Sequence, residues 1–69
     1  MTSMTPDDAR RVARIWATTD DEHARTVCNR LLVAFLRQYD TRVERDEWCR
    51  VLGDVAWKAG ETKRERMRG

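Results

Sequence analysis

Hydrophobic residues recur with the period of an α-helix in three segments of the chain, and no segment alternates as a strand would. In the first segment they follow the i, i+3, i+4, i+7 spacing of one helix face: Ala9, Val12, Ala13 and Trp16. Thr5 can cap the N-terminus of this helix, and Pro6 suits its first turn because proline needs no amide partner there. The pattern predicts a helix from about Pro6 to Ala17.

The second segment begins at Thr19-Asp20-Asp21-Glu22, which matches a capping box in which Thr19 and Glu22 bond each other's backbone amides. Its apolar residues cover about 200° of the helix, roughly twice the arc of an ordinary surface helix. They are Ala24, Val27, Cys28, Leu31, Leu32, Ala34, Phe35, Leu36 and Tyr39. We therefore expect this helix to be the central element, covered on two sides by the other helices or by a second copy of the protein.

The third helix has a clear apolar face, formed by Trp48, Val51, Leu52, Val55 and Ala59. Its start is open, because Thr41 with Glu44 forms one capping box and Asp46 could cap a later beginning. Gly60 is typical of the residue just after a helix C-terminus. Gly53 inside the helix costs about 1 kcal/mol relative to alanine, which suggests that its missing side chain serves a purpose.

These patterns predict an all-α fold, a small three-helix bundle with a flexible N-terminus and a basic C-terminal tail. A chain of 69 residues has room for one thin core, so residues 1–60 form a single domain in this interpretation. Residues 61–69 form the tail, either a frayed extension of the third helix or a disordered segment, in which Lys63, Arg64, Arg66 and Arg68 outnumber Glu61 and Glu65.

Composition narrows the class of protein. Hydrophobic residues make up 41% of the chain and charged residues 38%, which argues against intrinsic disorder. The longest apolar run, Leu31 to Leu36, is far shorter than the roughly 18 residues of a membrane span. No early apolar stretch resembles a signal peptide, so we expect a cytoplasmic protein with no membrane partner.

Groups for catalysis or metal binding are scarce. His23 is the only histidine, and it follows three acidic residues at a predicted helix start, where a solvated role is expected. Cys28 and Cys49 lie on the apolar faces and are predicted to be small buried side chains. A zinc site from His23 and both cysteines is the alternative, but closely spaced ligand pairs are missing. We expect no enzymatic activity, no cofactor and no metal.

Trp57 is the most informative residue for function. It follows Trp48 by nine residues, which is about 900° of helix, or roughly half a turn out of phase. Trp16 and Trp48 are predicted to be core residues, so Trp57 is expected to point away from the core. The alternative is that the N-terminal region covers Trp57, through Met1, Met4 or Ile15.

A protein-binding surface is therefore predicted around Trp57, with Gly53 and Arg50 on the same strip of the helix. A second candidate surface is formed by Val33 and Leu36 on the preceding helix, with Arg30 and Arg37 beside them. Either surface suits docking on a larger protein or formation of a homodimer. The expected function is a small non-catalytic protein-binding module, such as a phage or mobile-element inhibitor or regulator of host machinery.

Nucleic-acid binding is the rival hypothesis, because three-helix domains with basic arms often bind DNA. A transcriptional regulator of this kind would use the arginines of the first helix and the basic tail. The residues concerned are Arg10, Arg11, Arg14, Lys63, Arg64, Arg66 and Arg68. The formal net charge is only +2, which favours protein docking over phosphate binding.

Overall fold

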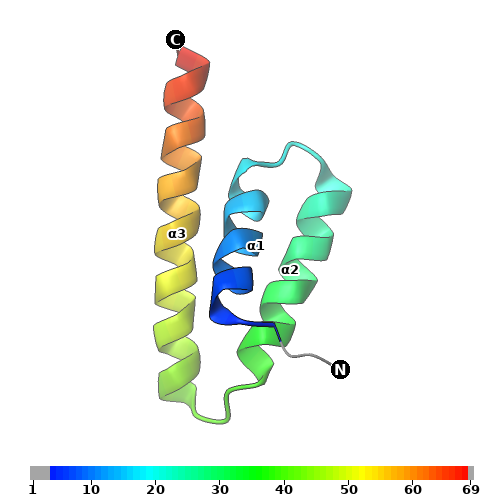
Figure 1. The fold of residues 1–69 in the computed structure, drawn as a ribbon, viewed down its shortest axis with the longest axis vertical. Helices are drawn as coiled ribbons and strands as arrows, with labels where there is room; N and C mark the ends of the chain where they lie inside the picture. The colour runs from blue at the N-terminus through cyan, green and yellow to red at the C-terminus, as the bar shows by residue number, and fades with distance from the viewer. Residues whose placement is uncertain (1–3, 69) are drawn as a thin grey trace.

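The computed structural model describes residues 4–68, which form three helices and no strand. The helices are α1 (Pro6–Thr18), α2 (Glu22–Arg37) and α3 (Arg42–Arg68), joined by short connections (Figure 1). The prediction of an all-α three-helix bundle is confirmed.

Two of the three helices begin where local sequence rules place them. The Thr5 hydroxyl accepts a hydrogen bond from the Asp8 amide at 3.2 Å, which caps α1 before Pro6. The Thr41 hydroxyl accepts one from the Glu44 amide at 3.2 Å. The open question about the third helix is thereby answered, because α3 begins directly after Thr41.

The capping box predicted for α2 is wrong. Asp21, and not Thr19, caps the helix, because its carboxylate accepts a hydrogen bond from the His23 amide at 3.0 Å. Thr19 belongs to the end of α1, where its own amide donates to the Ile15 carbonyl at 2.8 Å. A residue that ends one helix cannot also start the next in so short a connection.

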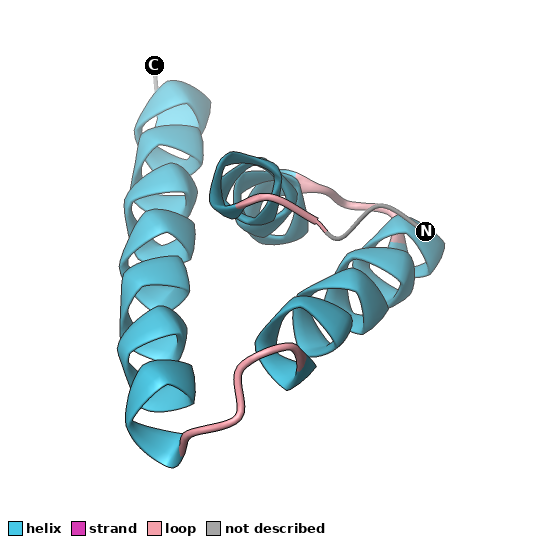
Figure 2. Ribbon diagram, turned by 60° about the horizontal axis from the view of Figure 1, so that its bottom comes forward, coloured by secondary structure: helices cyan, strands magenta, loops and turns pink. Residues whose placement is uncertain are grey.

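The central element is α1, so the prediction that the second helix would be central is wrong. Figures 1 and 2 show α1 packed against both neighbours, whereas α2 and α3 touch each other at few positions. The physical reason is the size of the α1 side chains. Ala9 and Ala13 are fully buried, and methyl groups let two helices approach α1 closely from different sides.

The core lies near the connection from α2 to α3. Phe35 is the one large side chain that is fully buried among residues 4–68, with 1% of its surface exposed. Its ring meets Trp48 edge to face at 5.2 Å and Tyr39 at 5.5 Å between centroids. Leu52 and Met4 pack against the same cluster. Trp48 is therefore a core residue, as predicted.

Helix α3 continues through Gly60 to Arg68, so the predicted end at Gly60 is wrong. Both glycines of this helix have ordinary negative φ angles, and a helix C-terminus at Gly60 would call for a positive one. The end of α3 projects past α1 and α2 (Figure 1). The residues predicted as a separate tail thus extend the last helix as far as Arg68.

Lys63 ties this extension to the rest of the molecule. Its ammonium donates to the Thr18 carbonyl at 2.7 Å and to the Asp20 carboxylate at 2.6 Å. The hydrogen bond and charge of Lys63 hold the pKa of Asp20 below its ordinary value of 3.8, and Arg25 adds a smaller effect in the same direction. Lys63 also stabilises the C-terminus of α1, where helix carbonyls attract a cation.

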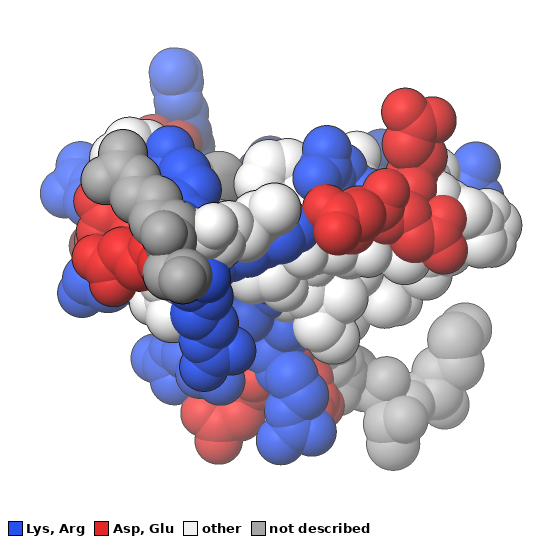
Figure 3. Space-filling model, turned by 90° about the horizontal axis from the view of Figure 1, so that it is seen from above, with Lys and Arg blue, Asp and Glu red and all other residues white. Residues whose placement is uncertain are grey.

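Charges of both signs are spread over the surface. Seen from the C-terminal end, Lys and Arg side chains are interspersed with Asp and Glu (Figure 3). In the described chain, residues 4–68, every helix is too short or too polar to cross a membrane.

Candidate functional site

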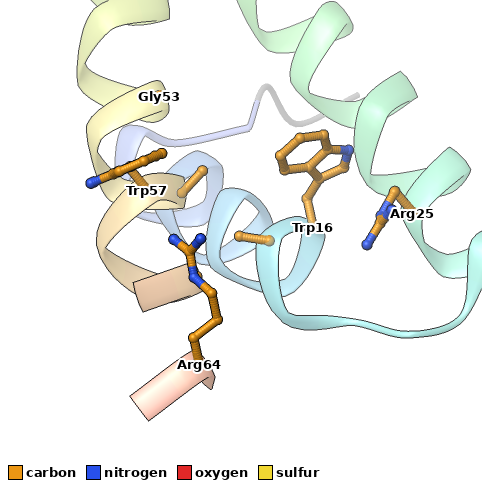
Figure 4. A pocket seen from close by; sticks show the side chains of 8 residues that line it. Trp16, Arg25, Gly53, Trp57 and Arg64 are labelled. Carbon is orange, nitrogen blue, oxygen red and sulfur yellow. The ribbon is translucent and has the colours of Figure 1, made fainter. Parts of the chain in front are cut away.

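An open hollow lies between the three helices, away from the aromatic core. Its volume is about 370 Å³, and residues of all three helices line it (Figure 4). We call it the tryptophan hollow, and its residues are Trp16, Ala17, Arg25, Gly53, Ala56, Trp57, Gly60 and Arg64. Figure 4 shows Trp16 projecting from α1 and Trp57 from α3.

Each tryptophan of the hollow is paired with an arginine. The Arg25 guanidinium lies 5.8 Å from the Trp16 ring centre, and that of Arg64 lies 5.4 Å from Trp57. Exposed fractions of 38% for Trp16 and 62% for Trp57 leave both indoles open to a partner. Cation–π contacts of this kind contribute about 0.5–1 kcal/mol at exposed sites. They therefore orient the arginine side chains but are weak enough for the guanidinium groups to bind a partner as well.

Small residues separate the two indoles and keep the hollow open. A methyl group added at Gly53 or at Gly60 would meet no atom within 4 Å. Packing within one chain therefore does not require glycine at either position. The purpose predicted for the missing Gly53 side chain is not found inside the monomer.

An apolar groove continues from the tryptophan hollow between α2 and α3. It shares Trp16, Gly53 and Ala56 with the hollow and adds Val33 and Leu36 from α2. Its remaining lining residues are Ala13, Asn29, Leu32, Cys49 and Leu52. The hollow and the groove thus form one continuous surface with apolar walls.

The two cysteines differ in their surroundings. Cys28 is buried, as predicted, whereas Cys49 is exposed at the groove, so that part of the prediction is wrong. Cys49 follows the core residue Trp48 by one position, which is about 100° around α3, so it lies at the edge of the core-facing side of the helix and borders the groove. Within residues 4–68, no three His, Cys, Asp or Glu side chains gather closely enough to hold a metal ion.

The structure brings together only some of the predicted partner-binding residues. Gly53 and Trp57 line the hollow, and Val33 lines the groove. Arg50 is exposed on α3 outside both surfaces. Arg30 and Arg37 are exposed on α2 and line neither. The second candidate surface is therefore reduced to Val33 and Leu36, which both line the groove.

Trp57 points outward, as the helical phase predicted. Of the residues considered as a cover, Met4 packs against the core cluster and Ile15 is 46% exposed. Met1 lies outside the described residues. Trp16, by contrast, was predicted to be a core residue, and its 38% exposure shows that this is wrong. Trp16 lies at the end of α1 where α2 and α3 no longer converge.

Sequence reasoning missed three residues of the hollow as partner contacts: Trp16, Arg25 and Arg64. Arg64 had a usable signal, because it follows Trp57 by seven residues and thus shares its face of a continuous helix. The expected helix end at Gly60 hid this relation. Arg25 had none, since no local pattern links it to a tryptophan of the preceding helix.

The basic residues of the rival hypothesis do not form one surface. Arg14, Lys63 and Arg66 line a hollow between α1 and α3, but Lys63 is bonded to Thr18 and Asp20. Arg64 lies beside Trp57 in the tryptophan hollow.

The other basic residues of the rival hypothesis whose side chains the structure describes do not extend the hollow that Arg14, Lys63 and Arg66 line. Arg10 pairs with Asp7 at 3.1 Å and lies over Trp48, while Arg11 is exposed. The Arg68 side chain lies outside what the structure describes.

One further surface runs the length of α3 on the side turned away from the core. Its positions alternate by three and four residues, so they form a stripe along the helix. We call this stripe the outer row, and it consists of Val43, Asp46, Arg50, Gly53, Trp57, Gly60, Arg64 and Met67. Apart from the half-buried Gly60, every one of them is exposed.

Comparison with known proteins assigns no family to this geometry. A search of protein-family models, of curated proteins and of solved structures finds no match for this chain. The surfaces described above are therefore the observations from which the function of this chain is inferred.

Proposed function

We propose that the protein is a small non-catalytic binding module that docks on a larger protein through the tryptophan hollow. The observation that carries the proposal is the pair of exposed indoles from two helices, each with an arginine over its ring. Tryptophan and arginine are the residue types that most often dominate the binding energy of protein interfaces. A monomer gains little by leaving two such side chains at the rim of an open hollow.

The chemistry of the hollow indicates what the partner presents. Indole walls and small residues accept an apolar or aromatic side chain. Arg25 and Arg64 supply guanidinium groups that pair with carboxylates in a bidentate manner. The matching surface is an apolar side chain flanked by Asp or Glu, with further apolar contacts along the groove.

Size and composition support a regulatory role. A chain of 69 residues without a recognisable catalytic group acts most directly by occupying a surface of its target. Inhibitors and regulators of host machinery from phages or mobile elements have this build, and we propose that class by analogy. The proposal includes action in the cytoplasm.

Nucleic-acid binding is supported less well. Among the predicted basic residues whose side chains the structure describes, only Arg14, Lys63 and Arg66 line a common hollow, and Lys63 is hydrogen-bonded within the chain. Phosphate binding draws on several free cations at once, and it weakens steeply with salt. A nucleic-acid target therefore remains one outcome of the test below.

A capture experiment with matched variants tests the proposal. Tagged protein is incubated with lysate of its source organism, in parallel with and without nuclease treatment, and the captured proteins are identified. Trp16→Ala and Arg25→Ala should lose the partner, because both residues line the hollow. Arg30→Ala is the control, since it removes an exposed α2 arginine that lies outside the hollow.

Two results would contradict the proposal. If Trp16→Ala and Arg25→Ala capture the partner as well as Arg30→Ala does, the hollow is not the docking surface. If capture disappears on nuclease treatment alone, the target is a nucleic acid.

A further inference from the structure

We propose that a second copy of this chain binds along the outer row of α3, so that two α3 helices pair antiparallel about a two-fold axis. The inference goes beyond the docking function. Because Gly53, Trp57, Gly60 and Arg64 belong both to the outer row and to the tryptophan hollow, the second copy and the docked partner compete for these residues. It rests on the complementarity of the outer row with itself when one copy is reversed.

The outer row is accessible and has the repeat of a helix-pairing surface. Its alternating steps of three and four residues are the spacing by which two helices interlock side chains over a long contact. Val43 and Met67, at its two ends, are 68% and 77% exposed. Four of its residues also line the open tryptophan hollow beside Trp16 of α1 and Arg25 of α2, namely Gly53, Trp57, Gly60 and Arg64.

Reversing one copy pairs large side chains with glycines. In an antiparallel pair, residues equally distant from the middle of the row lie opposite each other, and the middle falls between Gly53 and Trp57. Trp57 then faces Gly53 of the second copy, and Arg50 faces Gly60. Every large side chain in the central part of the row thus meets a position with no side chain.

This pairing explains two glycines that the monomer leaves unexplained. A glycine inside a helix is less favourable than alanine, and neither Gly53 nor Gly60 has a positive φ angle. A Cβ atom at either position would also meet nothing in its own chain. In the proposed dimer the missing side chains make room for Trp57 and Arg50 of the other copy.

Residues near one end of the outer row are complementary in charge and polarity to those near the other end, which they face in the second copy. Asp46 lies opposite Arg64 of the second copy, and the two-fold axis makes this ion pair twice. Within its own chain Asp46 has only an exposed contact with Arg42, at 3.9 Å, which leaves its carboxylate available. Val43 lies opposite Met67, so two exposed apolar side chains cover each other.

Parallel pairing has none of this complementarity. It would place Asp46 against Asp46, Arg64 against Arg64, and the two Trp57 indoles at the same height. In the antiparallel pair, Arg50 lies one turn from Arg64 of the second copy, and the two Asp54 carboxylates lie beside the axis. Each of them is already paired with Lys58 of its own helix at 3.1 Å.

Charge reversal with analytical ultracentrifugation tests the dimer. Wild-type protein should sediment as a dimer at high concentration. Asp46→Arg and Arg64→Asp should each weaken the dimer roughly tenfold to a hundredfold in Kd, because each creates two repulsive contacts per dimer. The double variant Asp46→Arg/Arg64→Asp restores the opposite charges and should recover wild-type dimerisation.

Matched controls keep the result interpretable. Glu44→Arg makes a similar charge reversal near the start of α3 but off the outer row, so it should leave the dimer intact. Trp16→Ala removes an indole that lines the hollow but does not belong to the outer row, so this variant should also dimerise. Circular dichroism of each variant shows that the helices are retained.

The proposal is overturned by any of three results. Wild-type protein that stays monomeric at the highest concentration reached has no such dimer. A dimer that tolerates both single reversals uses another surface or a parallel arrangement. Single reversals that dissociate the dimer without recovery in the double variant also exclude the Asp46–Arg64 contact. Partner capture is tested separately with Trp16→Ala and Arg25→Ala, which lie in the hollow but outside the outer row, so failure of the dimer and failure of the docking proposal are distinguished.

Discussion

The tryptophan side chain at one end of the bundle packs in the core, whereas the two at the other end are exposed. Near the α2–α3 connection, Trp48 is stacked on Tyr39 at 5.9 Å and packed edge to face on Phe35, so the end is closed. At the other end, Trp16 and Trp57 border an open hollow, and their close partners are arginines. The same residue type serves as core at one end and as surface at the other.

The separation of α2 and α3 explains this difference. At the closed end, a short connection holds the two helices together around Phe35 (Figure 2). At the open end, α1 lies between them, and Trp16 near the end of α1 stays 38% exposed. Large aromatic side chains are buried where three helices converge, and they line a surface where two of them diverge.

The substitution expected to destabilise the closed end most is Phe35→Ala. Removing a fully buried ring from a core costs about 3–5 kcal/mol, and a domain of this size is stable by a similar amount. We expect the variant to be largely unfolded, as measured by circular dichroism and urea titration. Phe35→Leu, which keeps most of the volume, should remain folded. A loss as small as that of an exposed residue would contradict the assignment of Phe35 to the core.

Gly53→Ala should have the opposite sign. Alanine favours the helix over glycine by about 1 kcal/mol, and its methyl group meets no neighbour in the monomer. The free energy of unfolding should rise by about that amount when it is measured at concentrations where the chain is monomeric. Gly60→Ala, at the second glycine of the outer row, should raise the free energy of unfolding in the same way. A loss of stability in the monomer would show that the space beside Gly53 is not open.

Trp57→Ala tests the open end directly. Because the indole is largely exposed, we expect the free energy of unfolding to fall by less than about 1 kcal/mol. Thermal or urea unfolding of the monomer measures the change. A loss comparable with that of Phe35→Ala would make Trp57 a core residue, and the comparison between the two ends would fail.

The smallest expected effect concerns the contact between Asp20 and Lys63. The pKa of Asp20 is lowered in the folded protein, so the contact contributes stability above the ordinary value of 3.8. That contribution is lost as pH falls through the lowered pKa. The stability difference between wild type and Asp20→Asn should therefore be constant near neutral pH and vanish in acid. A difference that grows in acid would contradict the assignment.

Local rules in the sequence predicted most of the secondary structure. Thr5 and Thr41 cap α1 and α3 because capping depends on atoms within three residues of each other. The same rules failed at Thr19, where two helix ends compete for one short connection. They failed again at Gly60, because glycine permits a helix end without enforcing one.

The candidate site was predicted in part. Helical phase placed Trp57 and Gly53 on one exposed strip of α3, since that relation depends on a single helix. Phase also placed Trp16 on an apolar stripe, but it could not show that the stripe is left uncovered at its end. The pairing of Trp16 with Arg25 joins two helices, and no spacing along the chain encodes it.

By itself, the amino-acid sequence determined three amphipathic helices, two of their caps and the outward direction of Trp57. These features depend on hydrogen bonds and side-chain directions within a few residues. Tertiary structure alone decided that α1 is central and that α2 and α3 diverge. The physical reason is that the approach of two helices depends on side-chain volumes from distant parts of the chain. Where Ala9 and Ala13 allow close contact the core forms, and where the helices separate a surface is left open.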